Sequence, residues 1–198
     1  LADALNVTAK LNKKGISGTI DVLGEAVQTK EEAIEAKNDC LKVLEELSKN
    51  KLDANLSIKP TQFGIKIDEE FAFELVMEVV KKAAEFNNFI RIDMEDSSLT
   101  DKTIQLFKRV KEKNSNVGIV LQAYLKRTFN DVTVLNKIGA NYRLCKGIYI
   151  EPAEIAYKDK NEIRKSFLKC LEEVIDKGNY IGIATHDEFL INSSYKMI

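Results

Sequence analysis

Hydrophobic and polar positions follow two different periods along the chain. Short apolar runs with alternating polar side chains predict β-strands, and longer stretches with apolar residues three or four positions apart predict α-helices. Strands are expected at residues 17–25, 55–60, 89–96, 117–124, 142–149 and 180–187. Helices are expected in the first residues and near 29–50, 68–87, 99–114, 129–138 and 159–177, and a further crossover helix is expected to begin within THDEFLINSSYKMI.

The regular alternation of strands and helices indicates parallel strands joined by right-handed crossover helices. Such a sheet is either open and doubly wound or closed into an eightfold barrel. The nucleotide-binding motifs of the open type, GxGxxG and GxxxxGK[ST], follow none of the predicted strands. We predict an α/β fold, and of the two closures we favour a (βα)8 TIM-type barrel that is incomplete in this chain, with about six strands present. Thr29 and Glu32 have capping-box spacing, which predicts the start of the first long helix.

Neighbouring side chains of a strand point to opposite faces of its sheet. One face of the predicted strands is apolar and carries Ile20/Val22, Leu56/Ile58, Ile90/Ile92 and Ile119/Leu121. The other face is polar toward the C-terminal ends and carries Thr19/Asp21, Ser57/Lys59, Arg91/Asp93, Val120/Gln122, Arg143/Cys145 and, less cleanly, Ala184/His186. In a barrel this polar face points inward, and active sites lie at its C-terminal rim. The aligned polar strand ends therefore predict a functional site.

Composition narrows the class of protein. With 44% hydrophobic and 31% charged residues, the chain has the composition of a soluble globular protein. Its net charge of -1 gives no basic excess for nucleic-acid binding, and no apolar run approaches membrane-spanning length. Three cysteines without a CxxC pair predict reduced thiols in a cytoplasmic protein. A single histidine argues against a multi-histidine zinc site, so we expect no metal.

Two residues at the polar strand ends have the chemistry of a catalytic site. Lys59 precedes Pro60 and could act as a Schiff-base nucleophile or as a fixed charge for a carboxylate or cofactor. Its alternative is a rim lysine that reaches water. Asp93 lies one step inside its strand and could be an acid or base, or an anionic partner for a nearby cation. Glu95 and Asp96 are more simply solvated turn residues.

Two cations stand in what otherwise has the pattern of a buried strand at 142–149. Burying Arg143 or Lys146 without a partner would cost several kcal/mol or more, so an anionic partner is expected.

The other polar strand ends each allow two interpretations. Gln122 could hydrogen-bond a planar ligand or simply face solvent. His186 could be a base, a stacking ring or a capping group, and it could equally be structural. Cys145 is most simply a small buried hydrophobic residue.

Six of these segments together resemble one enzyme family. The matching pieces span nearly the whole chain and read DVLGE (21–25), SIKPTQFG (57–64), IRIDMED (90–96), VLQAYL (120–125), YRLCKGIYIEP (142–152) and IATHD (183–187). The sequence is similar to the catalytic domain of proline dehydrogenase, the flavin-dependent enzyme of proline catabolism. The resemblance implies a distorted (βα)8 barrel holding FAD at its C-terminal rim, and it selects the barrel over the open sheet. Residues 1–198 are then expected to form one catalytic barrel domain.

The resemblance also implies roles for individual residues. Arg143 would lie beside the flavin ring near N5 and is expected to be catalytic, as is Asp93. Lys59 is implied on the substrate side, and Asp21 and Glu25 are implied to help close the substrate pocket. The residues implied to bind the cofactor are Met94, Gln122, Arg143, Cys145, Lys146, Gly147, Ile148, Tyr149, Ala184, Thr185 and His186.

The implied reaction is hydride transfer from C5 of L-proline to flavin N5, which gives Δ1-pyrroline-5-carboxylate. Electrons would then pass to a quinone, which implies peripheral contact with the inner membrane without spanning it. The family's seventh and eighth strands and its last helix, which carries an arginine pair for the proline carboxylate, have no counterpart in the sequence. We therefore expect these 198 residues alone to oxidise proline inefficiently.

Two other functions remain compatible with the residues. One is a Schiff-base aldolase on the same barrel, with Lys59 as its nucleophile. The other is an inactive barrel fragment that serves only as a binding module. Flavin content separates all three hypotheses.

Overall fold

The computed structural model describes residues 1–24 and 26–198, in two compact units. The first unit comprises Leu1–Asp93 and Leu99–Val117, and the second comprises Met94–Ser98 and Gly118–Ile198. Glu25, expected at the substrate pocket, lies outside the described residues.

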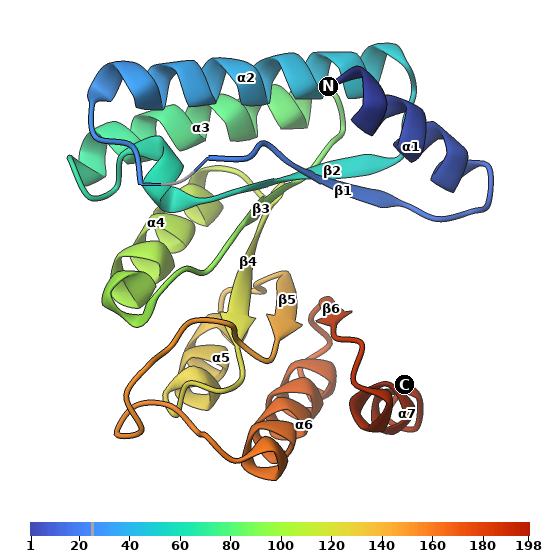
Figure 1. Cartoon of the computed structure of the whole chain (residues 1–198), viewed down its shortest axis with the longest axis vertical. Helices are drawn as coiled ribbons and strands as arrows, with labels where there is room; N and C mark the ends of the chain where they lie inside the picture. Colours follow the sequence, from blue (N-terminus) through green and yellow to red (C-terminus); the bar gives the residue numbers. More distant parts are fainter. Residues whose placement is uncertain (25) are drawn as a thin grey trace. The chain divides into compact units, whose positions relative to one another are not determined.

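In the first unit, parallel strands alternate with helices. Its elements are α1 (Ala2–Asn12), β1 (Gly18–Asp21), α2 (Lys30–Lys49), β2 (Ala54–Ile58), the 3₁₀ turn η1 (Pro60–Phe63), α3 (Glu69–Glu85), β3 (Ile90–Ile92) and α4 (Thr100–Lys113). β1 pairs with β2 and β2 with β3, in parallel. Helices α2 and α3 run side by side along these strands (Figure 1).

The second unit repeats the pattern. Its elements are the 3₁₀ turn η2 (Ser97–Leu99, whose last residue belongs to the first unit), β4 (Val117–Gln122, which begins in the first unit), α5 (Thr128–Asn136), β5 (Tyr142–Cys145), α6 (Lys160–Asp176), β6 (Ile181–Ala184) and α7 (Glu188–Tyr195). β4 pairs with β5 and β5 with β6, again in parallel. Helix α6 contacts both α5 and α7 (Figure 1).

The helices lie within two residues of their expected bounds, and α7 confirms the crossover helix expected near the end of the sequence. The predicted capping box is present, because Thr29 Oγ1 accepts from the Glu32 amide at 3.2 Å and the Glu32 carboxylate accepts from the Thr29 amide at 3.3 Å. The strand centres are also confirmed. The expected strands were too long, chiefly at their C-terminal ends.

The clearest error in strand length is at β5, expected over 142–149 and ending at Cys145. Gly147 has φ 118°, which turns the backbone out of the strand path. Ile148 and Ile150, which continue the apolar alternation in the sequence, are 86% and 99% exposed. Lys146 therefore lies in a loop and not in a buried strand.

The apolar strand face forms the core beneath the helices, as expected. Leu56, Ile58, Ile90, Ile92 and Ile119 are fully buried. Burial of each such side chain contributes roughly 1.5–3 kcal/mol to folding, which explains why these positions are uniformly aliphatic. The opposite strand face is left to the polar residues of the site.

Two cysteines belong to the helical part of the core. Cys40 on α2 and Cys170 on α6 are buried free thiols. Burial raises the pKa of Cys40 to about 12 and that of Cys170 to about 11.

Within residues 1–24 and 26–198, no helix is long and apolar enough to cross a bilayer.

Candidate functional site

The ends of β1 and β2 bring Asp21 and Lys59 together. Asp21, the last residue of β1, pairs with Ser57 of β2. Lys59 follows Ser57 by two residues and therefore lies just past the end of β1. Lys59 Nζ lies 2.7 Å from Asp21 Oδ2, and both side chains are partly buried. Asp21 Oδ1 is buried, and among the described residues it has no hydrogen-bond partner. This edge therefore presents a cation beside a buried acceptor that lacks a donor.

The third predicted residue of this unit, Asp93, is held by β2. Ser57 Oγ donates to Asp93 Oδ1 at 2.7 Å, and the Asp93 amide donates to the Ile58 carbonyl at 2.8 Å. Arg91, two residues earlier, is buried with its guanidinium 4.8 Å from the centre of the Phe89 ring. Asp93 is thus fixed by both its backbone and its side chain, and it stays partly exposed.

The strand ends of the second unit place the predicted cofactor residues in rows. In one row Gln122, Cys145 and Ala184 are register partners across β4, β5 and β6. In the row two residues earlier, Arg143 lies between Val120 and Gly182. Regular parallel pairing therefore aligns residues that are about 60 positions apart in the sequence.

Gln122 joins two loops of this unit. Its amide nitrogen donates to the Glu95 carbonyl at 2.8 Å, and its amide oxygen accepts from the Ile148 amide at 3.4 Å. Gln122 is 2% exposed and Glu95 is 4% exposed, so the solvent-facing alternatives considered for them are wrong. The bond to Gln122 holds the Glu95 backbone against β4 instead of leaving it in solvent. Met94, beside it, is also buried.

Gly147 allows a close approach between the loop after β5 and Tyr124. A Cβ atom at this position would lie 2.2 Å from Tyr124 Cδ1, inside any permitted contact. The Tyr124 amide donates to the Lys146 carbonyl at 2.8 Å, which fixes the loop over the ring. Burial, together with the nearby charge of Glu151, raises the pKa of Tyr124 to about 12.

Lys146 faces the carboxylate of Asp187, a residue for which the sequence predicted no role in the site. Its Nζ lies 3.4 Å from Asp187 Oδ2, and Asp187 has a side chain only 3% exposed. Arg164 of α6 holds the same carboxylate with both ends of its guanidinium, Nε to Oδ2 at 3.0 Å and Nη2 to Oδ1 at 2.8 Å. Hydrogen bonds from Arg164 are the main reason that the pKa of Asp187 lies well below its usual range, and Lys146 adds to the effect.

Asp187 also begins α7, because its Oδ1 accepts from the Phe189 amide at 3.2 Å. An aspartate directly before a helix is a recognisable capping signal in IATHD. The pairing with Arg164, 23 positions earlier, has no such signal in the sequence. Of the residues expected here, Thr185 Oγ1 accepts from the Asp187 amide at 3.1 Å, whereas His186 is exposed.

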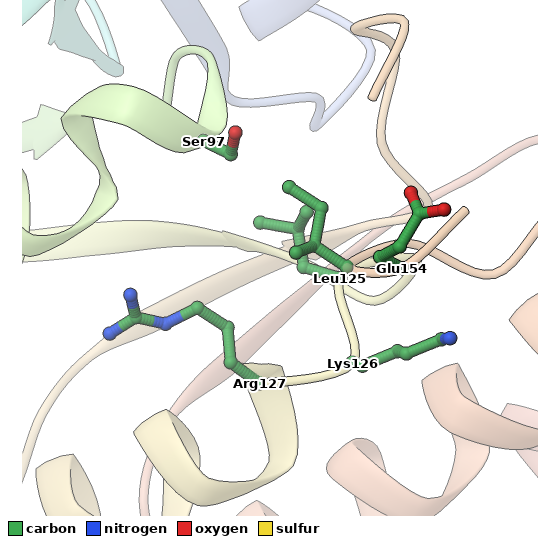
Figure 2. A pocket seen from close by; sticks show the side chains of 6 residues that line it. Ser97, Leu125, Lys126, Arg127 and Glu154 are labelled. Carbon is green, nitrogen blue, oxygen red and sulfur yellow. The ribbon is translucent and has the colours of Figure 1, made fainter. Parts of the chain in front are cut away.

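A cavity of about 290 Å³ in the second unit is lined by other residues (Figure 2). It is lined by Ser97, Leu125, Lys126, Arg127, Glu154 and Ile155, none of which was expected at the site. Figure 2 shows Lys126 and Arg127 extending in opposite directions. Arg127 pairs with Asp131 at 2.8 Å, and Lys126 donates to the Ala153 carbonyl.

Among the described residues, no cluster of histidine, cysteine and carboxylate side chains could hold a metal ion.

Comparison with known proteins assigns the family. The model of the family described as Proline dehydrogenase matches residues 4–198. The chain belongs to the proline dehydrogenase family. Proline dehydrogenase 1 of Bacillus subtilis subsp. natto is 31% identical over 198 residues, which are 100% of this chain and 66% of the relative. Proline dehydrogenase 2 of Bacillus subtilis (strain 168) is 33% identical over 92% of this chain and 60% of its own length. The chain thus spans less than two thirds of these two proline dehydrogenases.

Solved structures of proline utilization A (PutA) have the same fold. The protein from Bdellovibrio bacteriovorus, described as inactivated by N-propargylglycine, matches 99% of this chain and 25% of its own, with a TM-score of 0.89 and 23% identity. The protein from Corynebacterium freiburgense matches 98% of this chain and 24% of its own, with a TM-score of 0.84 and 26% identity. The expected α/β barrel class and the expected proline dehydrogenase family are both confirmed, with six parallel strands in the part of the chain that is described.

Proposed function

We propose that this protein is an FAD-dependent enzyme that oxidises L-proline to Δ1-pyrroline-5-carboxylate. The observation that carries the proposal is the match of residues 4–198 to the proline dehydrogenase family. The polar strand ends support it, because they supply charged and hydrogen-bonding groups at the rim where barrel enzymes work. Overall, proline would lose two electrons and two protons, and a quinone would take up both electrons and both protons.

The residues of the second unit fit a flavin dinucleotide. The Lys146 side chain is 34% exposed and its contact to Asp187 is long, at 3.4 Å, so it can also serve a diphosphate. Gly147 presents bare backbone, and Ile148 offers an exposed apolar surface. We propose that FAD is held by these residues and by the others expected from the resemblance, namely Met94, Gln122, Arg143, Cys145, Tyr149, Ala184, Thr185 and His186. FAD, when bound, would supply the hydride acceptor that protein side chains lack.

The chain's own residues would bind and orient proline. Lys59 offers a positive charge for the substrate carboxylate. Asp21 Oδ1, which has no hydrogen-bond partner among the described residues, offers an acceptor for the ring nitrogen. Asp93, fixed by Ser57, is proposed to act in the same site. Arg143, in the second unit, is proposed to contribute a permanent positive charge beside the flavin.

The aldolase alternative is disfavoured by the ion pair of Lys59. A Schiff-base lysine must lose its proton before it attacks, and a carboxylate 2.7 Å away stabilises the charged form. Borohydride added with carbonyl substrates should therefore trap no adduct on Lys59. A covalent product at Lys59 would restore the aldolase hypothesis.

Flavin content tests the proposal most directly. Protein purified with added FAD should be yellow, should release free FAD on denaturation, and should lose its flavin absorbance when L-proline is added without an electron acceptor. N-propargylglycine, named as an inactivator of the Bdellovibrio relative, should abolish this bleaching. A colourless protein that does not bind added FAD would refute the proposal.

Arg143 can be tested separately. If its charge assists the redox step, Arg143→Met should slow proline-dependent flavin bleaching by about 10²–10³ in stopped-flow measurements while FAD stays bound. Arg109→Met is the matched control, since Arg109 pairs with Glu70 on the exposed surface of the first unit. Bleaching at the wild-type rate in Arg143→Met would leave Arg143 with a structural role only.

We further propose that a quinone accepts the electrons during peripheral contact between a cytoplasmic enzyme and the inner membrane. Vesicles loaded with quinone should then support turnover, and vesicles without quinone should not. Sedimentation of the vesicles measures how much protein is bound to them. That residues 1–198 act as one catalytic domain stays a prediction.

A further inference from the structure

Asp187 is shared by two cations of very different geometry. Arg164 binds both carboxylate oxygens, at 2.8 and 3.0 Å, whereas Lys146 reaches only one of them, at 3.4 Å. The carboxylate is almost completely buried, while Lys146 remains one-third exposed. The buried negative charge is thus satisfied mainly by Arg164.

This division leaves Lys146 available to another anion. A buried carboxylate without a partner is very costly, so it takes whatever cation can reach it. The planar fork of arginine satisfies both oxygens at once, which a lysine ammonium cannot do. Phe189 supports this arrangement, because the Arg164 guanidinium lies 4.9 Å from the centre of its ring.

We propose that Arg164 is a positioning residue for the cofactor site: by holding Asp187 bidentately, it prevents this carboxylate from capturing Lys146 and leaves the lysine free for the diphosphate of FAD. The inference rests on the proposed function. Without Arg164, Asp187 would draw the Lys146 ammonium inward and form a short ion pair with it. Lys146 would then bind the cofactor more weakly although its own side chain is unchanged.

The test is a double-mutant cycle read by FAD binding to the flavin-free protein, followed by fluorescence. Arg164→Met should raise the Kd for FAD by about tenfold, the scale of one charge-assisted hydrogen bond. Arg164→Met combined with Asp187→Asn should restore binding to within about threefold of wild type, because the competing charge is gone and asparagine still caps α7. Arg109→Met, which removes another arginine–carboxylate pair packed on a phenylalanine ring, should leave the Kd unchanged.

A second measurement needs no flavin. Acetylation of Lys146 in the flavin-free protein, followed by mass spectrometry, should be slower in Arg164→Met than in wild type and should recover in the double variant. A tighter ion pair with a buried carboxylate draws the amine inward, where the reagent reaches it less easily. Lys169 of α6, whose Nζ lies 3.7 Å from the centre of the Phe129 ring, provides an internal reference.

The possible outcomes separate the two proposals. Equal FAD binding and equal Lys146 acetylation in Arg164→Met and wild type would overturn the positioning role while leaving the proposed function intact. Equal losses in the single and double variants would show that Arg164 acts only on structure, which also overturns it. Failure of the wild type to bind FAD would remove the proposed function and the role assigned to Arg164 with it.

Discussion

Gly147 leaves room for the Tyr124 ring at a point where a methyl group would overlap it. We expect Gly147→Ala to destabilise the protein by roughly 1–3 kcal/mol, because a buried ring must move and φ 118° is unfavourable for alanine. Urea unfolding measures the loss. Gly178→Ala is the matched control, since Gly178 also has positive φ but nothing within 4 Å of its added Cβ. Equal losses in the two variants would show that the ring contact contributes nothing.

Asp187 should make folding sensitive to acid. Its pKa is lowered in the folded state, so its carboxylate stabilises the fold fully above the unfolded pKa of about 3.9. As the pH falls below that value, the unfolded chain takes up the proton first, and the contribution is lost as the pH falls through the folded pKa. The difference in unfolding free energy between wild type and Asp187→Asn should therefore be constant from pH 7 to 5 and should shrink below pH 4. A difference that is unchanged at pH 3 would contradict this sign.

The burial or exposure of a single side chain was predictable where the residue lies within the alternating pattern of a strand. Leu56 and Ile58 follow the alternation and are buried, and Lys59 follows it to the polar rim. Glu95 and Ile148 lie past the strand ends, where a turn resets the direction of each side chain. One was expected in solvent and is buried, and the other was expected in a strand and is exposed. The alternating pattern of a strand does not extend to such loop positions, so it cannot predict whether their side chains are buried.

At the scale of elements, the capping box of α2 gives a local test. Thr29→Ala removes the acceptor for the Glu32 amide and should cost about 1 kcal/mol of unfolding free energy in urea titrations. Thr133→Ala is the control, because Thr133 lies inside α5 and its hydroxyl donates to the Phe129 carbonyl one turn earlier. Alanine suits a helix interior better than threonine, so no loss is expected there. A comparable loss in both variants would remove the special role of the cap.

Element types were predictable because helices and strands repeat their pattern over many residues. The stripe of Leu44 and Leu47 on α2, for example, is fully buried. Contacts between elements were not predictable in the same way. Whether Arg164 on α6 reaches Asp187, which precedes α7, depends on how far α6 is rotated about its own axis. The hydrophobic stripe of a helix is broad, so it defines this rotation only approximately.

At the scale of the whole molecule, the chain spans 66% of Proline dehydrogenase 1 of Bacillus subtilis subsp. natto. A proline carboxylate taken out of water needs fixed cationic partners, and Lys59 supplies a single point charge. We expect a hybrid that joins the remaining part of that relative to this chain to have kcat/KM for proline at least about tenfold higher, the value of one charge-assisted hydrogen bond. Dye-reduction assays with FAD supplied to both proteins measure this ratio. Equal kcat/KM would show that the 198 residues already contain what catalysis needs.

The two buried thiols, one in each compact unit, are natural reporters of local opening. A pKa of about 12 at Cys40 and about 11 at Cys170 leaves a thiolate fraction roughly 10³-fold and 10²-fold below that of a free thiol, in addition to the steric protection. Alkylation at pH 8 should therefore proceed only through openings of α2 or α6, and mass spectrometry can count them separately. Matching rates at both cysteines would mean that the two halves of the chain open together, and unmatched rates would rank them by stability.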